Sequence, residues 1–115
     1  MSTDKKTIGI IPRNQPILKK LVAEGTFATE NDAAKFAFAL AAKKGVAAGT
    51  AEGADTKWAS GSFDSDHNLQ LIVAAMYDTQ EPYRLIECLI NRGLEMMDKG
   101  DGVSPDVFGE ILPAE

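Results

Sequence analysis

The chain has 115 residues, of which 44% are hydrophobic and 25% charged, and its net charge is −5. This size leaves room for one core, so we expect a single domain over 1–115, and the composition excludes wholesale disorder. No apolar run approaches the roughly 18 residues of a membrane span, and no secretory signal follows the first lysines, so we expect no membrane partner. The single cysteine, Cys88, cannot form a disulfide within the chain, which favours a cytoplasmic location.

The charges are divided unevenly along the chain. Residues 1–47 hold eight Lys and Arg against four Asp and Glu, whereas residues 48–115 hold four against thirteen. The front part therefore has a charge of +4 and the back part −9. Such an asymmetry marks an interaction surface, or it means only that the two parts have different solvated surfaces.

A strand and a helix are expected first. A short run rich in β-branched residues at 6–11 is closed by Pro12 and predicts a strand. Asn14 offers a helix cap and Pro16 suits a first helical turn. The helix should end at Gly25, a typical C-terminal cap residue.

A second helix is expected over 33–44. Thr29, with Asp32 three residues later, forms a variant of the capping box before it. Nearly every residue of this helix is apolar, so it should be buried on all sides, with Phe36 and Leu40 in a core or an interface. One short chain is not expected to cover such a helix alone, so we predict a homo-oligomer.

The back part begins without a clear pattern. Residues 46–61 are rich in Gly, Ala, Ser and Thr, which predicts a linker or a wrapped loop with Trp58 as its anchor. Residues 62–115 are expected to form an acidic helical extension.

Two helices forming a hairpin are predicted in this extension, over about 67–77 and 83–99, with a possible turn after Ser104. Asp66 is expected to cap the first helix, and Asp78 with Glu81 to form a capping box before the second. The second helix is amphipathic. Its inward residues are expected to be Leu85, Ile86, Leu89, Ile90, Leu94 and Met97, and its outward residues Arg84, Glu87, Asn91, Glu95 and Asp98.

Patterns that carry chemistry fail on spacing or number. The segment from Asp64 begins like a calcium loop, but Leu69 and Ala75 stand where that loop needs glycine and glutamate. One histidine, His67, and one cysteine, Cys88, are too few for a zinc site and fit a helix start and a core thiol better than a catalytic dyad. The glycines do not follow a nucleotide-binding spacing. We therefore expect a chain that is not an enzyme, with no metal and no cofactor.

A family resemblance covers residues 6–45. There a strand, a helix, the segment from Gly25 to Ala33 (Gly-x-Phe-x-Thr-x-x-Asp-Ala) and an alanine-rich helix follow one another. This order resembles the ribbon-helix-helix family of bacterial DNA-binding proteins, above all its antitoxin-type members. In that family two chains pair their strands into a ribbon and bury their second helices against each other. The resemblance implies a mainly helical homodimer in transcription regulation.

The resemblance also implies a DNA site in the front part of the chain. Thr29 and the N–H groups that follow it would bind a phosphate. The outer face of the strand would enter the major groove, and nearby cations would add phosphate contacts. The expected DNA-binding residues are Lys5, Lys6, Thr7, Gly9, Arg13 and Thr29.

The strand departs from the family in its side chains. Its outward set is formed by residues 6, 8 and 10 or by residues 7, 9 and 11. Neither set offers more than one of the Arg, Lys, Asn and Gln residues that read base edges best. The alternative to regulatory DNA binding is therefore an oligomeric protein-interaction subunit without a DNA-reading face. In that alternative the acidic second half binds a basic protein partner.

Overall fold

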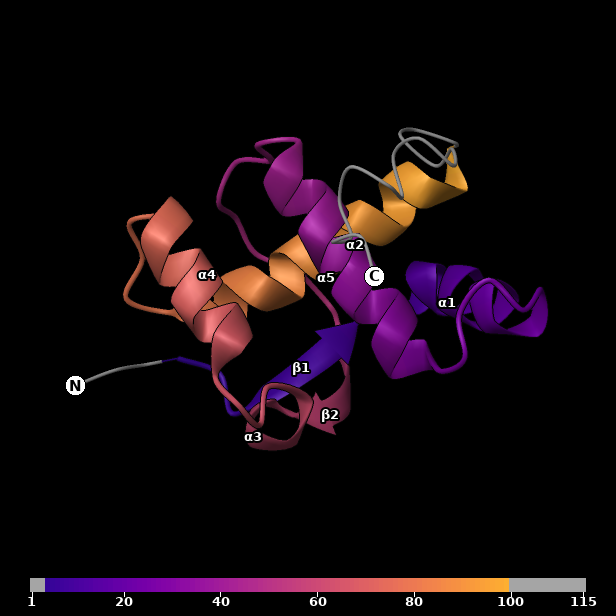
Figure 1. The fold of residues 1–115 in the computed structure, drawn as a ribbon, viewed down its shortest axis with the longest axis horizontal. Coiled ribbons are helices and arrows are strands. Elements are labelled where there is room, and N and C mark those ends of the chain that lie inside the picture. Colours follow the sequence, from indigo (N-terminus) through magenta and orange to yellow (C-terminus); the bar gives the residue numbers. More distant parts are fainter. Residues whose placement is uncertain (1–3, 100–115) are drawn as a thin grey trace.

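Figure 1 shows a computed structural model of the chain, which describes residues 4–99. Within this range five α-helices and a two-stranded antiparallel sheet form one mainly helical domain with an N-terminal strand, as the sequence predicts. Residues 1–3 and 100–115, including the turn expected after Ser104, lie outside the described residues. The elements are β1 (Thr7–Ile10), the 3-10 turn η1 (Pro12–Asn14), α1 (Gln15–Ala23), α2 (Glu30–Lys43), β2 (Asp55–Ala59), α3 (Ser60–Phe63), α4 (Asn68–Met76) and α5 (Pro82–Asp98).

The front of the chain follows its local signals. Gly25 has a φ of +77°, a left-handed conformation that glycine adopts without steric cost, and it ends α1. Thr29 caps α2, because its hydroxyl oxygen accepts a hydrogen bond from the N–H of Asp32 at 3.1 Å. The predicted order of strand, helix and capped second helix is confirmed.

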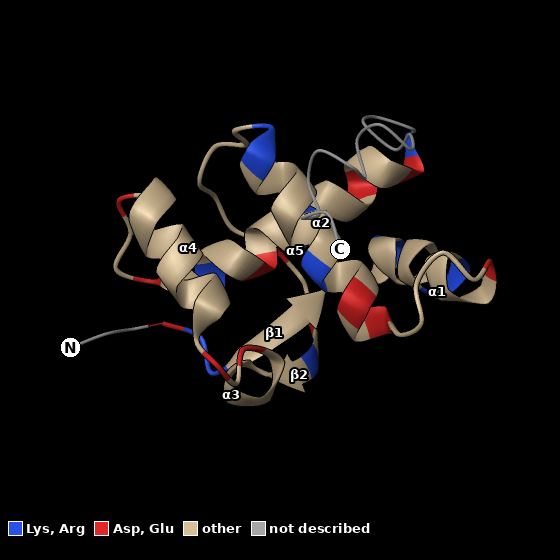
Figure 2. Cartoon of the chain, in the orientation of Figure 1, with Lys and Arg blue, Asp and Glu red and all other residues tan. Residues whose placement is uncertain are grey.

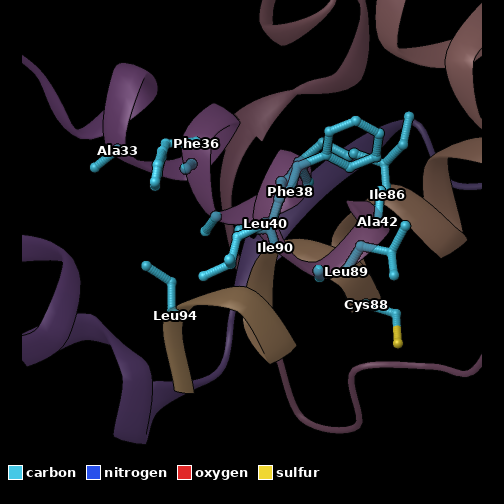
Figure 3. Packing of buried hydrophobic residues seen from close by; sticks show 14 of the residues in the cluster. Ala33, Phe36, Phe38, Leu40, Ala42, Ile86, Cys88, Leu89, Ile90 and Leu94 are labelled. Carbon is cyan, nitrogen blue, oxygen red and sulfur yellow. The ribbon is translucent and has the colours of Figure 1, made fainter. Parts of the chain in front are cut away.

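The core of the domain lies where α2 crosses α5. The view in Figure 3 places Phe38 and Leu40 of α2 among Ile86, Leu89 and Ile90 of α5, and all five side chains are buried. Apolar area removed from water at this crossing is the main favourable contribution to folding.

The backbones of α2 and α5 approach unusually closely. A Cβ atom added at Gly93 of α5 would lie 2.0 Å from the carbonyl oxygen of Ala37 in α2. Only a glycine opposite a small residue permits this approach. The alanines of α2 therefore serve a contact within the chain.

The expectation that α2 needs a second chain to cover it is wrong. Phe36 and Leu40 are buried, as predicted, but α1 and α5 of the same chain contact α2. Beyond the first turn of α2, only charged positions such as Lys35 are exposed. A second chain is not needed to cover this helix.

A strand forms inside the segment expected to be a linker or a wrapped loop. Residues 46–54 run as a loop, but β2 pairs with β1, with Thr7 opposite Ala59 and Ile8 opposite Trp58. The register shifts after Ile8, and Gly9 then approaches β2 so closely that a Cβ would lie 2.8 Å from the carbonyl oxygen of Asp55. The sequence of β2 lacks the alternation of a half-buried strand, so its pairing with β1 decides its conformation.

The cap of α4 differs from the predicted one. Asp66 accepts a hydrogen bond from the N–H of Asn68, but the buried Asp64 accepts those of Leu69 at 2.9 Å and Gln70 at 3.1 Å. Asp64 thus satisfies donors of the first turn that have no partner within the helix. The acids of the calcium-like segment begin a helix.

The cap of α5 comes from the other end of the chain. The carboxylate of Asp4 accepts hydrogen bonds from the N–H groups of Tyr83 and Arg84, each at 3.0 Å. The expected capping box is replaced by this long-range contact, and Glu81 makes no side-chain cap to α5. A negative carboxylate at a helix N-terminus is favourable electrostatically. None of the described helices combines the length and the apolar character that a bilayer crossing requires.

Candidate interaction surface

The strand expected to read DNA is enclosed by its own chain. Ile8 and Ile10 of β1 are fully buried, and Gly9 between them is buried as well. One edge of β1 pairs with β2. The strand therefore exposes no row of side chains that could enter a groove of DNA.

The other edge of β1 is bonded to side chains of α5. Glu87 Oε2 accepts a hydrogen bond from the N–H of Gly9 at 2.7 Å. Asn91 Oδ1 accepts one from the N–H of Ile11 at 2.8 Å, and Asn91 Nδ2 donates to the carbonyl oxygen of Gly9 at 3.2 Å. Among the described residues, no edge of β1 stays open for pairing with a strand of a second chain.

Glu87 and Asn91 were expected on the outward face of their helix, and this prediction is wrong. They are 2% and 0% exposed. Buried polar groups need partners, and these two find them on the backbone of β1, with the Lys5 ammonium forming an ion pair with Glu87. Their spacing of four residues is the signal in the sequence, because it places both on one face of α5.

The expected DNA-binding residues on and before β1 have different surroundings. Lys5 is engaged by the buried Glu87, whereas Lys6 is exposed. The Thr7 hydroxyl oxygen accepts a hydrogen bond from that of Thr56 in β2 at 3.5 Å. Of these three side chains, only that of Lys6 is exposed to an approaching phosphate.

The remaining expected DNA contacts stand beside acids. Arg13 is exposed, but its guanidinium donates to Glu95 at 2.8 Å. Thr29 is exposed at the start of α2, with Glu30 and Asp32 in the first turn of the same helix. Glu30 pairs with Lys57, whereas the Asp32 carboxylate complements the positive end of the helix and would repel a phosphate there.

The two residues considered for a catalytic dyad lie in unlike surroundings. Cys88 is buried in α5, and this burial is the main cause that raises the pKa of its thiol. His67 is exposed just before α4, in a left-handed conformation with a φ of 62°. A protonated, buried thiol is a poor nucleophile. Within residues 4–99, no group of three His, Cys, Asp or Glu residues is arranged to hold a metal ion.

An exposed apolar face on α4 is the surface that the sequence reading missed. Leu71, Ile72 and Met76 are 65%, 43% and 53% exposed, and Ala75 between them is exposed too. These four residues, here called the α4 face, follow the i, i+1, i+4, i+5 spacing of a helix side that packs against another element. In the described part of the chain nothing covers them.

The opposite side of α4 holds the helix firmly on the domain. Val73 is fully buried, and Leu69 packs against the core. Tyr77, just after the helix, donates its hydroxyl to the carbonyl oxygen of Val46 at 2.7 Å. The Tyr83 hydroxyl donates a hydrogen bond to the capping Asp64 at 3.1 Å. Burial is the largest cause that raises the pKa of Tyr83 to about 12, and this hydrogen bond is the second. The α4 face is therefore presented by an anchored helix.

α4 carries no charge along its whole length. None of its nine residues is Asp, Glu, Lys, Arg or His, so the helix is drawn entirely in tan in Figure 2. The exposed acids Asp66 and Asp78 lie in the chain before and after it. Figure 1 places α4 toward one end of the molecule and α1 toward the other.

The α4 face has a signal in the sequence. Leu69, Val73 and Tyr77 form one apolar stripe four residues apart, and Leu71, Ile72, Ala75 and Met76 form a second. A nine-residue helix in a small domain buries only one side, so the second stripe has to stay exposed or meet a partner. Comparisons with family models, with curated proteins and with solved structures give no match for this chain.

Proposed function

We propose that this chain is a non-catalytic protein-interaction subunit and that the α4 face is its binding surface. The observation that carries this proposal is the exposure of Leu71, Ile72 and Met76 side by side on an uncharged, anchored helix. Exposed apolar residues that gather in one patch are typical of protein-binding sites, whereas scattered ones are ordinary. We place the subunit in the cytoplasm, where Cys88 stays reduced.

Regulatory DNA binding, which the ribbon-helix-helix resemblance implies, is the second candidate. The order of strand, helix and Thr29-capped helix favours it. Against it stand the enclosed β1 and the acids beside Arg13 and Thr29. These features leave the α4 face as the better-supported surface.

A photo-crosslinking amino acid placed at Ala75 tests the first candidate. Ala75 is exposed at the centre of the α4 face, so irradiation in the source cells should give covalent adducts with a protein. The same amino acid at Lys20, exposed on α1, is the matched control and should give none. Equal labelling at both positions, or no adduct at Ala75, contradicts the proposal.

A salt titration on duplex DNA tests the second candidate. At ~50 mM salt even non-specific electrostatic binding to DNA is strong, so a DNA-binding protein should be retained there. Lys6→Ala and Arg13→Ala should then each lower the slope of log affinity against log salt by about one unit. Absence of retention at this salt excludes the DNA candidate.

A further inference from the structure

We infer that the α4 face binds the α4 face of a second copy of this chain, with the two helices antiparallel. This inference rests on the proposed function and names its partner. It also gives the predicted homo-oligomer a different surface, because α2, the helix first expected to need a second chain, is covered within one chain.

The α4 face is complementary to itself in shape. A contact between two identical surfaces has a two-fold axis, so each residue meets its symmetric counterpart. With the axis level with the middle of the α4 face, between Val73 and Ala74, Leu71 lies opposite Met76 of the second copy, and Ile72 lies opposite its Ala75. The large Ile72 then faces a small residue, which lets the helices approach closely and interdigitate.

Charge favours the same meeting point. Two copies, each with a net charge of −5, repel one another overall. α4 contains no ionisable side chain, so no like charges oppose one another along the two helices themselves. A basic partner would instead require acids within the contact. The exposed acids next to α4 in the chain, Asp66 and Asp78, lie beyond the two ends of the helix.

The size of the face sets the expected strength. A helix of nine residues is about 14 Å long, at 1.5 Å per residue. It cannot by itself bury the ~800 Å² per partner of a standard stable interface. We therefore expect a reversible dimer with a dissociation constant in the micromolar range.

Sedimentation equilibrium of the purified full chain tests the inference. Between about 10 and 500 µM, a range that brackets weak association, the average mass should rise from 12.3 kDa toward twice that value. Leu71→Asp should weaken dimerisation by at least about tenfold, since it places a charge in the contact. Thr26→Asp adds the same charge at an exposed position between α1 and α2 and should leave dimerisation unchanged. Circular dichroism should show both variants folded, because Leu71 is 65% exposed.

Disulfide formation tests the antiparallel orientation. Under mild oxidation, an equal mixture of Leu71→Cys and Met76→Cys should give mixed dimers in preference to either homodimer. The native Cys88 is buried, so the wild-type chain gives the background level of disulfide-linked dimers. A preference for Leu71→Cys homodimers would indicate parallel helices and overturn the orientation.

The outcomes separate this inference from the proposed function. A single 12.3 kDa species at every concentration, or a dimer unaffected by Leu71→Asp, overturns the second-copy partner. If the Ala75 photo-probe then still gives an adduct of another mass, the α4 face binds a different protein and only the partner is wrong. If the probe gives no adduct either, the interaction function fails as well.

Discussion

At the scale of single residues, Asn91 connects α5 to the N-terminal strand. Its side-chain amide donates to the carbonyl oxygens of Gly9 and Glu87, and its oxygen accepts from Ile11 N–H and from Asn14. Each buried group left without a partner costs about 1–3 kcal/mol. Asn91→Leu leaves the Gly9 carbonyl oxygen and the Ile11 N–H without their hydrogen-bond partner. The urea midpoint of unfolding should therefore fall strongly.

The exposed Asn68 provides the control for this substitution. Asn68→Leu makes the same chemical change on the surface. Measured at low protein concentration, it should change the free energy of unfolding by no more than about 0.5 kcal/mol. Equal effects at the two positions would mean that the bonds of Asn91 add nothing to stability.

Glu95 gives the domain a predicted sensitivity to acid. Burial would raise the pKa of its carboxyl group, but hydrogen bonds from Asn14 and Arg92, together with Arg13, outweigh burial and lower it below the ordinary value of 4.5. A carboxyl with a lowered pKa stabilises the fold fully above its unfolded-state pKa and loses that contribution as the pH falls through the folded-state pKa.

Glu95→Gln tests this sign. The difference in unfolding free energy between wild type and variant should be largest at neutral pH and should shrink below about pH 4.5. Urea unfolding at pH 7 and pH 3 measures it, with the exposed Glu24→Gln as the surface control. A difference that is the same at both pH values would contradict the role assigned to Glu95.

At the scale of elements, the approach of α2 and α5 depends on one glycine. Gly93→Ala would place a methyl group 2.0 Å from the Ala37 carbonyl oxygen and 2.5 Å from its carbon, so the helices must separate. Overpacking of this kind typically costs about 1–3 kcal/mol, and backbone atoms give way less easily than side chains. We expect a marked fall in melting temperature.

Gly61→Ala is the control for Gly93→Ala. Gly61 lies in the helical turn α3, and a Cβ there would meet nothing within 4 Å. Alanine in place of a helical glycine is typically stabilising by about 0.5–1 kcal/mol. A lower melting temperature for Gly61→Ala than for Gly93→Ala would contradict the close packing of α2 on α5.

The elements also show how far local patterns reach. α2 was predictable because Thr29 caps it and its apolar residues follow one another, and α5 because its core face repeats regularly. β2 was not, because Asp55–Ala59 becomes a strand only through its pairing with β1, a long-range contact. The buried Glu87 was missed for the same reason, since its partners Lys5 and Gly9 lie about eighty residues away.

The candidate surface was predictable in part. The second apolar stripe of α4 can be read from the positions of Leu71, Ile72, Ala75 and Met76. Which stripe packs inward depends on the anchors of the helix, Tyr77 on Val46 and Asp64 beneath its first turn, and these contacts are set by the tertiary fold.

At the scale of the whole molecule, the first and last described elements hold each other in place. Removing residues 1–11 would take from Glu87 its bond to Gly9 and its ion pair with Lys5, and from Asn91 its bonds to Gly9 and Ile11. It would also leave β2 without a neighbour. It would also remove Ile8 and Ile10 from the core, and burial of such a side chain contributes about 1.5–3 kcal/mol, a large share of the stability of a small domain. The truncated chain should lose its cooperative thermal transition in circular dichroism.

Lys6→Ala is the control for this truncation, because it keeps the strand and changes only an exposed side chain. It should melt cooperatively, close to the wild type. A truncated chain that melts as cooperatively as Lys6→Ala would show that β1 is dispensable for the fold.

The enclosure of β1 also means that this strand can reach its final place only late in synthesis. Its hydrogen bonds to α5 join residues 78 to 82 positions apart, so Ile8 and Ile10 leave the ribosome long before their cover exists. Contacts that close so much chain form slowly, and apolar strands that wait for them are prone to misassembly. The nascent chain therefore needs to stay soluble until α5 has emerged. The four polar or charged residues from Asp4 to Thr7 precede the apolar strand and favour its solubility.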